Sequence, residues 1–139
     1  NFSGTVQLNH PKGTQMTNIE GGCYCGAIRY QFKEPRGSAL CYCENCRKVS
    51  GAQSLAWVGV ARENVEIVRG NPATYVAPNG TTWSFCSNCG TTLFWKPKEE
   101  GPFTVTTGSL DDPAAFPPMS TTYDEDRIPW EPHLMGKEE

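Results

Sequence analysis

The sequence predicts a single, mainly β domain with very short helices. Apolar and polar residues alternate in several short segments, and this period of two is typical of strands with one buried face. Ile28, Tyr30 and Phe32, for example, alternate with Arg29 and Gln31. A chain of 139 residues is long enough for one modest hydrophobic core. Seven cysteines, gathered in three tight groups, indicate that cross-links strengthen this small core.

The predicted strands follow one another between turns rich in Gly, Asn and Pro. Two of them flank the sequence PNG at residues 78–80, which is typical of the turn in a β-hairpin. Helices of a turn or two are expected only near residues 44–49 and 112–115, and Asn45 is expected to cap the first. The predicted strands lie at residues 28–32, 55–60, 65–68, 74–76, 82–85, 93–95 and 103–106.

Polar flanks surround this central part of the chain. Residues 1–18 contain Pro and Gly and show no apolar period, so they are predicted to form an N-terminal lead-in. Residues 19–130 are expected to form the folded domain, and residues 131–139 a charged C-terminal tail. Trp130 is expected to attach this tail to the body of the domain.

Composition argues against two classes of partner. With 12 Lys and Arg against 15 Asp and Glu, the formal net charge is −3, whereas general nucleic-acid binding needs a basic face. No run of eighteen apolar residues is present, so we expect no membrane span. No secretory signal is visible in the sequence from Asn1 onward, and a leader removed before Asn1 would leave no trace in it. The sequence predicts a cytoplasmic protein without nucleic-acid or membrane partners, and it predicts no particular oligomeric state.

The cysteines form two pairs and a triplet, and their spacing favours metal binding over disulfides. An odd number leaves one thiol unpaired in any intramolecular disulfide scheme. Cysteines separated by a single residue are also too near to bridge each other comfortably. Metal thiolates, in turn, indicate a reducing compartment. Disulfides and unliganded buried thiols remain the alternatives. The pairs are Cys23 with Cys25 and Cys86 with Cys89, and the triplet is Cys41, Cys43 and Cys46.

Zinc chemistry suggests how the seven cysteines divide. Structural zinc takes four tetrahedral ligands, commonly thiolates, and a reactive zinc keeps three protein ligands and one open position. The two pairs would supply a closed site and the triplet an open one, although the triplet borrowing a thiol from a pair is another possible division. Gly90 follows the CxxC pair and suits the left-handed turn of a zinc knuckle. His10 and His133 lie far from every cysteine group, so no histidine ligand is expected.

Three motifs resemble one known family. They are GCYCGAIRY at residues 22–30, CYCENCRKVSG at residues 41–51 and WSFCSNCGT at residues 83–91. The chain is similar over residues 18–130 to the glutathione-dependent formaldehyde-activating enzymes, the family that includes centromere protein V. All seven cysteines are in register with the family pattern.

The resemblance implies a compact zinc-binding fold of coiled antiparallel β-sheets with two zinc ions per chain. It implies a structural zinc on the two pairs and a second zinc on the triplet, open to a substrate thiol. The cysteines of the triplet would then be the catalytic ligands. The implied activity is that of a carbon–sulfur lyase, in which glutathione and formaldehyde combine reversibly to S-hydroxymethylglutathione. A small thiol and a small electrophile would be the partners, with glutathione as co-substrate.

Other residues are candidates for contacts with the substrate. Arg47 and Lys48 follow the triplet and could bind the carboxylates of glutathione, although they could equally balance the charge of the thiolates. Gln53 is a further candidate for substrate binding. Trp57 and Trp83 are candidates for a pocket wall, although buried aromatic residues in small β domains usually belong to the core.

The sequence leaves alternative functions open. Tyr42 and Tyr123 stand where the family often has histidine, and packing is favoured over proton transfer for each. The protein could therefore be a lyase of specialised metabolism that acts on a different substrate. It could also be a non-catalytic binding module stabilised by zinc, or use its thiols in redox chemistry.

Overall fold

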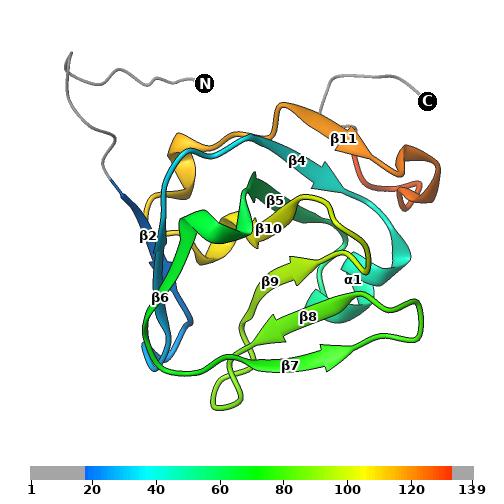
Figure 1. Ribbon diagram of the computed structural model, residues 1–139. Coiled ribbons are helices and arrows are strands. Elements are labelled where there is room, and N and C mark those ends of the chain that lie inside the picture. The colour runs from blue at the N-terminus through cyan, green and yellow to red at the C-terminus, as the bar shows by residue number, and fades with distance from the viewer. Residues whose placement is uncertain (1–17, 133–139) are drawn as a thin grey trace.

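A computed structural model describes residues 18–132, which form two β-sheets (Figure 1). The smaller sheet has the order β2–β3–β6, and the larger has the order β11–β4–β5–β10–β9–β8–β7. The smaller comprises β2 (Ile19–Gly22), β3 (Arg29–Phe32) and β6 (Val65–Arg69). The larger comprises β4 (Gly37–Cys41), β5 (Leu55–Val60), β7 (Ala73–Val76), β8 (Thr82–Phe85), β9 (Thr92–Lys96), β10 (Phe103–Thr106) and β11 (Ser120–Thr122).

Helical structure within the described residues is limited to one short α-helix and four 3₁₀ turns. The mainly β class with very short helices is therefore confirmed, and both expected helical positions are occupied. No helix in this part of the chain has the length and hydrophobicity needed to cross a bilayer. The helical elements are α1 (Glu44–Ser50), η1 (Arg62–Asn64), η2 (Thr107–Ser109), η3 (Pro113–Ala115) and η4 (Asp124–Asp126).

The pairing of the strands is antiparallel with one exception. Strand β11 runs parallel to β4 at one edge of the larger sheet, so that Thr122 lies opposite Cys41. The expected hairpin joins β7 to β8, and the Ala77 amide donates a hydrogen bond to the Thr81 carbonyl across its turn. Gly80 adopts a φ of +88° in this turn, which favours glycine.

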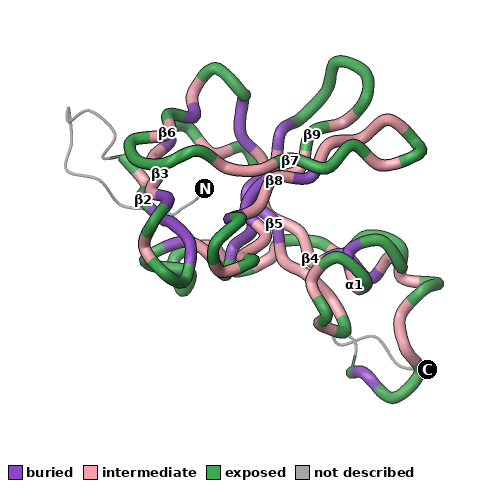
Figure 2. Tube along the Cα trace, turned by 90° about the horizontal axis from the view of Figure 1, so that it is seen from below, coloured by how far each residue is buried: buried purple, intermediate pink, exposed green. Residues whose placement is uncertain are grey.

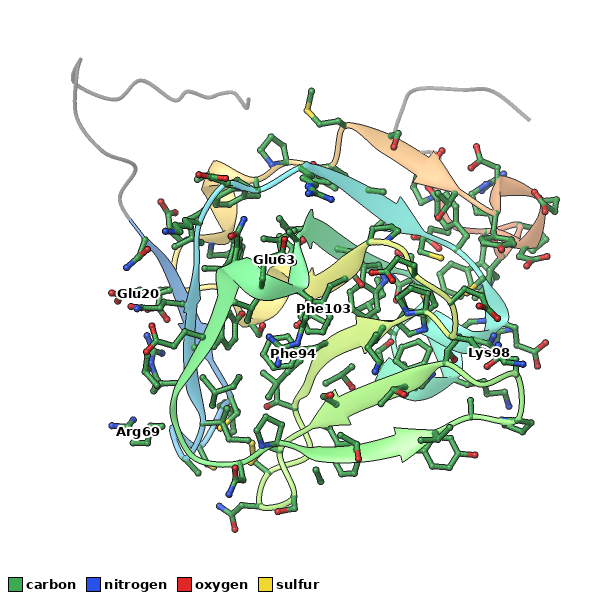
Figure 3. All side chains as sticks on the ribbon, viewed as in Figure 1. Glu20, Glu63, Arg69, Phe94, Lys98 and Phe103 are labelled. Atoms are coloured by element: carbon green, nitrogen blue, oxygen red, sulfur yellow. The ribbon has the colours of Figure 1, made fainter. Side chains whose placement is uncertain are left out.

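The main core lies between the two sheets. Tyr30 and Phe32 of β3 are buried on one side, as their alternation predicts, and Val58 of β5 is buried on the other. The rings of Tyr30 and Phe94 meet edge to face at 5.1 Å, and those of Phe94 and Phe103 lie 5.4 Å apart. Figure 3 shows Phe94 and Phe103 directed into the interior, and Figure 2 shows the buried chain at the centre of the molecule.

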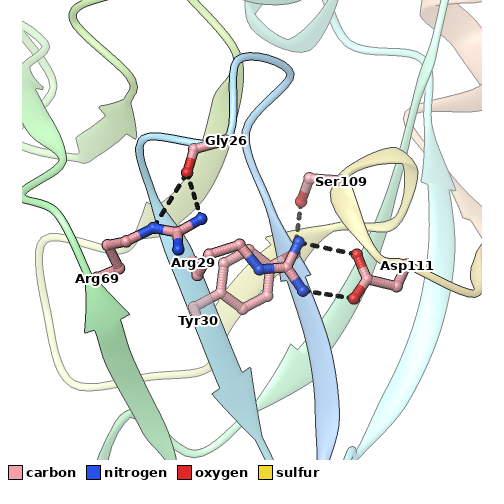
Figure 4. Close-up of polar contacts among 6 residues, drawn as sticks. All are labelled: Gly26, Arg29, Tyr30, Arg69, Ser109 and Asp111. Atoms are coloured by element: carbon pink, nitrogen blue, oxygen red, sulfur yellow. Dashed lines mark hydrogen bonds and ion pairs between the residues drawn. The ribbon is translucent and has the colours of Figure 1, made fainter.

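A polar junction also joins the smaller sheet to the segment after β10 (Figure 4). Both terminal nitrogens of Arg29 donate to the Asp111 carboxylate, at 3.0 and 2.5 Å. The hydroxyls of Tyr30 and Ser109 are hydrogen-bonded at 2.5 Å, and the Asp111 amide donates to the Glu20 carbonyl at 2.9 Å. The turn at residues 107–111 is therefore held against the edge of the smaller sheet.

The Arg29–Asp111 pair provides a test of electrostatic stability. The hydrogen bond from Arg29 lowers the pKa of Asp111 below its usual value. The stabilisation is therefore present above the unfolded-state pKa and is lost as the pH falls through the lower folded-state pKa. Because the side chains of Arg29 and Asp111 are 29% and 50% exposed, solvent screening limits the effect to less than about 1 kcal/mol.

Asp111→Asn is expected to lower the free energy of unfolding by this small amount at pH 7, and its effect should decline as the pH falls through the lowered folded-state pKa of Asp111. Urea denaturation at pH 7 and at a series of acidic pH values measures the difference. Asp112→Asn is a matched control, since it removes a neighbouring exposed carboxylate that forms no ion pair with any residue between 18 and 132. An equal loss in both variants, or a loss that persists in acid, would contradict this assignment.

The prediction that Trp130 attaches the C-terminal segment is wrong, because its side chain is 70% exposed. Glu131 is the buried residue instead, and its carboxylate accepts a hydrogen bond of 2.9 Å from the Ser54 hydroxyl. A polar contact therefore makes the attachment that was expected of an aromatic ring. His10 and His133 lie outside the described residues, as do almost all of the predicted lead-in and most of the predicted tail.

Candidate metal centres

The two cysteine pairs meet where the turn between β2 and β3 approaches the turn between β8 and β9. The sulfur atoms of Cys23, Cys25, Cys86 and Cys89 all lie within 4.8 Å of one another. The Sγ atom of Cys25 is 3.7 Å from that of Cys23 and 3.8 Å from that of Cys86. Four thiolates at about 2.3 Å from a tetrahedral zinc lie about 3.8 Å apart, so this donor set fits zinc. All seven cysteines are free of disulfide bonds.

The turn at residues 86–90 has the features predicted from its CxxCG sequence. The amides of Asn88 and Cys89 donate to the Sγ atom of Cys86, at 3.3 and 3.4 Å. Gly90 has a φ of +85°, and its amide closes the turn by donating to the Cys86 carbonyl at 2.7 Å. The amides of Asn88 and Cys89 stabilise negative charge on the Sγ atom of Cys86, as a metal-binding thiolate requires.

A second turn presents Cys23 in the same manner. The Ile28 amide donates to the Sγ atom of Cys23 at 3.2 Å, and the Gly26 amide donates to the Cys23 carbonyl at 3.1 Å. Gly26 has a φ of +83°. The Arg69 guanidinium donates two hydrogen bonds to the Gly26 carbonyl, so β6 holds this turn in place (Figure 4).

Further contacts link the two turns and prepare their sulfurs for a metal. The Asn88 side chain donates to the Sγ atom of Cys25 at 3.2 Å, across the interface between the turns. The hydroxyl of Thr91 lowers the pKa of Cys89 to about 5, so this thiol ionises below neutral pH. The Thr91 hydroxyl also accepts a hydrogen bond from the Tyr24 amide at 3.0 Å. The four-cysteine cluster thus joins the smaller sheet to the larger one.

The triplet forms a separate cluster at the start of α1, on the opposite side of the molecule from the smaller sheet (Figures 1 and 2). Cys41 ends β4, and the sulfurs of Cys41, Cys43 and Cys46 lie within 4.8 Å of one another. Cys43 caps α1, because its Sγ atom accepts the Cys46 amide at 3.3 Å. The prediction that Asn45 caps this helix is therefore wrong, and a ligand candidate does so instead.

Hydrogen bonds among the three thiols shift their pKa values in opposite directions. The Cys46 thiol lowers the pKa of Cys41 to about 5, and the same contact raises the pKa of Cys46. Burial raises the pKa of Cys43. The indole N–H of Trp57 donates to the Sγ atom of Cys46 at 3.4 Å. Metal binding to such a cluster requires the remaining thiol protons to leave.

Beside the triplet lies a cavity with a volume of about 520 Å³, and all three cysteines contribute to its wall. No further Cys, His, Asp or Glu joins this cluster within residues 18–132, whereas the other cluster has four members. A metal on the triplet would therefore have three protein ligands from this part of the chain, and its fourth coordination position would face the cavity. This arrangement matches zinc sites that keep a position for a substrate.

The structure brings together only some of the predicted substrate-site residues. Trp57 and Trp83 line the cavity and are also buried in a small core cluster, so both of the roles considered for them are present. Arg47 and Lys48 on α1 and Gln53 after it do not line the cavity, so its geometry gives no support to their predicted role in substrate binding.

The two tyrosines considered for proton transfer differ in their environments. Tyr42 is only 1% exposed and belongs to the interior, which agrees with the packing role favoured for it. Tyr123 is exposed, lines the cavity and has a φ of +57°, which is an uncommon backbone conformation for a non-glycine residue.

Sequence reasoning missed several residues in the cavity wall. Trp95 belongs to a strand that was predicted, but it was not predicted to face the cavity. Glu44, Asn79 and Asp126 come from α1, the β7–β8 turn and η4. Their spacing along the chain gives no signal of this proximity, since tertiary structure alone brings the three elements together.

Comparison with known proteins places the chain in a family. The sequence profile described as glutathione-dependent formaldehyde-activating enzyme matches residues 18–126, which include both cysteine clusters. The chain belongs to this family. The resemblance carried by the three cysteine motifs is thereby confirmed.

Two curated relatives extend the comparison with this glutathione-dependent formaldehyde-activating family. An uncharacterized lyase of Schizosaccharomyces pombe is 33% identical over 82 residues, which are 58% of each chain. A putative glutathione-dependent formaldehyde-activating enzyme of Halomonas elongata is 31% identical over 85 residues, which are 55% of this chain and 54% of the relative. The chain thus spans a little over half the length of the curated relatives that it matches.

A solved structure is similar in fold. The crystal structure of a Rhodobacter sphaeroides protein superposes with a TM-score of 0.58 and 21% sequence identity, and covers 74% of this chain and 99% of that one. At this identity the likeness concerns the fold alone.

Proposed function

We propose that the protein is a cytoplasmic zinc-dependent carbon–sulfur lyase with a zinc-binding domain at residues 19–130. It acts on an adduct between glutathione, or a similar thiol, and a small electrophile, and S-hydroxymethylglutathione is the simplest example. The observation that carries this proposal is the three-cysteine cluster in the wall of a 520 Å³ cavity. Family membership and the names of the relatives support the same chemistry.

The two clusters would hold zinc for different purposes. The four-cysteine cluster, closed by its own ligands, would hold a structural ion, and Cys41, Cys43 and Cys46 would hold a second one. Zinc at the triplet would lower the pKa of a substrate thiol and stabilise its thiolate.

The residues around the triplet would fix its ligands and shield the substrate. The indole N–H of Trp57 and the amide of Cys46 each donate to a sulfur of the triplet, and such contacts orient metal ligands. The buried Trp57 and Trp83 reduce the access of water to this side of the cavity. Two residues with hydroxyl groups, Thr122 and Tyr123, also line the cavity.

The reaction makes or breaks one carbon–sulfur bond. In the direction of synthesis, the thiolate sulfur of the substrate attacks the carbonyl carbon, and the carbonyl electron pair moves to oxygen, which takes up a proton. In the direction of cleavage, the adduct hydroxyl loses its proton as the carbon–sulfur bond breaks. The hydroxyls of Thr122 and Tyr123 are the candidates for donors or acceptors in this proton transfer.

The direct test combines metal analysis with an exchange assay. We expect two zinc ions per chain, and we expect the protein to accelerate the exchange of ¹³C-formaldehyde with S-hydroxymethylglutathione in proportion to protein concentration. NMR exchange spectroscopy measures the rate against the spontaneous reaction. One zinc per chain, or a rate equal to the spontaneous one with this and other thiol adducts, would refute the proposal and favour a binding module.

The contact between Trp57 and Cys46 makes a further prediction. Trp57→Phe removes the N–H donor and is expected to weaken metal binding at the triplet by about tenfold, while the four-cysteine cluster keeps its ion. Competition with a chelator of known affinity measures the two sites separately.

Trp95→Phe is a suitable control for this prediction, because Trp95 also lines the cavity but donates no hydrogen bond to a sulfur of the triplet in the structure. Equal weakening by the two variants would show that lost packing, and not the lost donor, is responsible.

A further inference from the structure

We infer that the cavity beside the triplet takes a thiol, or its adduct, that carries a ring-sized apolar group and an ammonium group, and that it discriminates against thiols rich in carboxylates. This inference rests on the proposed function in taking a thiol as the ligand that approaches the triplet, and it narrows that ligand from glutathione to a similar thiol of different charge. Three properties of the cavity carry it, namely its size, its aromatic wall and its charge.

The cavity is large for a one-carbon electrophile. Its volume of about 520 Å³ falls within the range of pockets that hold drug-sized ligands, about 300–1,000 Å³. A formaldehyde unit on a sulfur would fill only a small part of this space. A substituent of the size of an aromatic ring would fill it better and would exclude water from the apolar wall.

Three tryptophans supply the apolar wall. The rings of Trp57 and Trp83 lie 5.9 Å apart and are inclined at 55°, and those of Trp83 and Trp95 lie 6.5 Å apart at 68°. All three residues line the cavity. Rings inclined to one another present both faces and edges, and the faces of tryptophan attract a cation as well as an apolar group.

The charged residues of the wall are acidic. Glu44 of α1 and Asp126 of η4 both line the cavity, and both are exposed. No Lys, Arg or His is among its lining residues within the described chain. Three thiolates with a bound zinc ion would add a net charge of −1 to the same space. Together these charges favour a cation over an anion in the cavity.

Three basic residues near the cavity do not line it. Arg47 and Lys48 are on α1 but outside the cavity wall. Arg127 follows Asp126 and donates to the carbonyls of Ile128 and Glu131. The two carboxylates of a thiol such as glutathione would therefore be repelled by the carboxylates of the cavity wall and would gain nothing from the tryptophan faces. An ammonium group would be attracted by both.

A matched set of thiols tests the inference on the zinc-loaded protein. The probes are phenylmethanethiol and its para-aminomethyl and para-carboxylate derivatives, together with cysteamine and glutathione. Quenching of tryptophan fluorescence at pH 7.5 gives the dissociation constants. The aminomethyl compound is expected to bind at least about tenfold more tightly than the carboxylate, with the neutral compound between them. Cysteamine, a cation without a ring, and glutathione are expected to bind more weakly than the aminomethyl compound.

Substitutions assign the selectivity to the wall. Replacing both carboxylates, by Glu44→Gln with Asp126→Asn, is expected to bring the affinities for the cationic and anionic probes within about threefold of each other, because the contribution of the wall carboxylates to attraction and repulsion is removed. Glu125→Gln is the matched control, since this neighbouring carboxylate is not in the cavity wall. Trp95→Leu should weaken the three aromatic probes by a larger factor than it weakens cysteamine, which loses only the attraction between its ammonium group and the ring face.

Each outcome separates this inference from the proposed function. Tighter or equal binding of the carboxylate probe overturns the inference, as does a selectivity that survives the double substitution. If the probes do not show the expected ranking but S-hydroxymethylglutathione is exchanged, the proposed function stands and only the inference fails. If the expected ranking is found but no thiol adduct is turned over, the inference holds as a statement about binding and the proposed function fails.

Discussion

Cys86→Ser is expected to unfold the protein under conditions in which the parent protein is fully folded. Cys86 is buried in the main core, and its sulfur is one of the four that join the two sheets. Binding of a structural zinc contributes about 10–16 kcal/mol in small zinc domains. This is as much as the entire net stability of a typical domain, about 5–15 kcal/mol. Circular dichroism should show the loss of the cooperative thermal transition.

The same result should follow when the ion itself is removed. A strong chelator added to the parent protein is expected to abolish the transition, and zinc should restore it. The chelator should have little further effect on the Cys86→Ser variant, because its cluster has already lost its ion. A variant that keeps a cooperative transition near that of the parent would show that the four-cysteine cluster does not hold the fold together.

Cys43→Ser is expected to abolish activity and leave the fold intact. Cys43 caps α1, and serine is a preferred residue at this position, so its hydroxyl can accept the Cys46 amide in place of sulfur. The thermal midpoint should therefore stay within about 3 °C of the parent value. The turnover of the thiol adduct should fall by about a thousandfold or more, as expected from losing about 4 kcal/mol of metal-ion assistance.

Metal analysis on the Cys43→Ser variant makes this prediction more specific. We expect the zinc content to fall from two ions per chain to one, with the remaining ion on the four-cysteine cluster. Asn45→Ala is a useful control, because Asn45 lies in the same cavity wall and was expected to cap α1, yet Cys43 has that role. Unfolding of the Cys43→Ser variant would make the triplet structural, and full activity would exclude it from the chemistry.

Much of the fold could be predicted because most of its strands have a strong local signal. The alternation around Tyr30 and the apolar run at residues 55–60 each predict a strand that the structure contains. Strand β4 was missed because its sequence, GSALC, consists mainly of small residues without alternation. Strand β11, with the sequence STT, was missed because it is short and polar, and it depends on pairing with β4. Strand β2 was missed because two of its four residues are glycines, which give no apolar alternation.

The candidate site divides in the same way. The four-plus-three grouping of the cysteines could be predicted, because metal chemistry restricts the number of ligands and their spacing within a turn. The structure brings the sulfurs together in this grouping, while metal binding itself stays a prediction. The wall of the cavity could not be predicted, because Glu44, Asn79 and Asp126 share no local pattern and are brought together only by the tertiary structure.

The parallel strand β11 has a consequence for how such a protein could diversify. It lies at one edge of the larger sheet and pairs only with β4, and it leads directly into Tyr123 and Asp126 of the cavity wall. All seven cysteines lie outside this segment. Exchanging residues 123–128 between homologous proteins would therefore change this part of the cavity wall without replacing a cysteine, whereas Thr122, which lies opposite Cys41, ties the strand itself to the triplet.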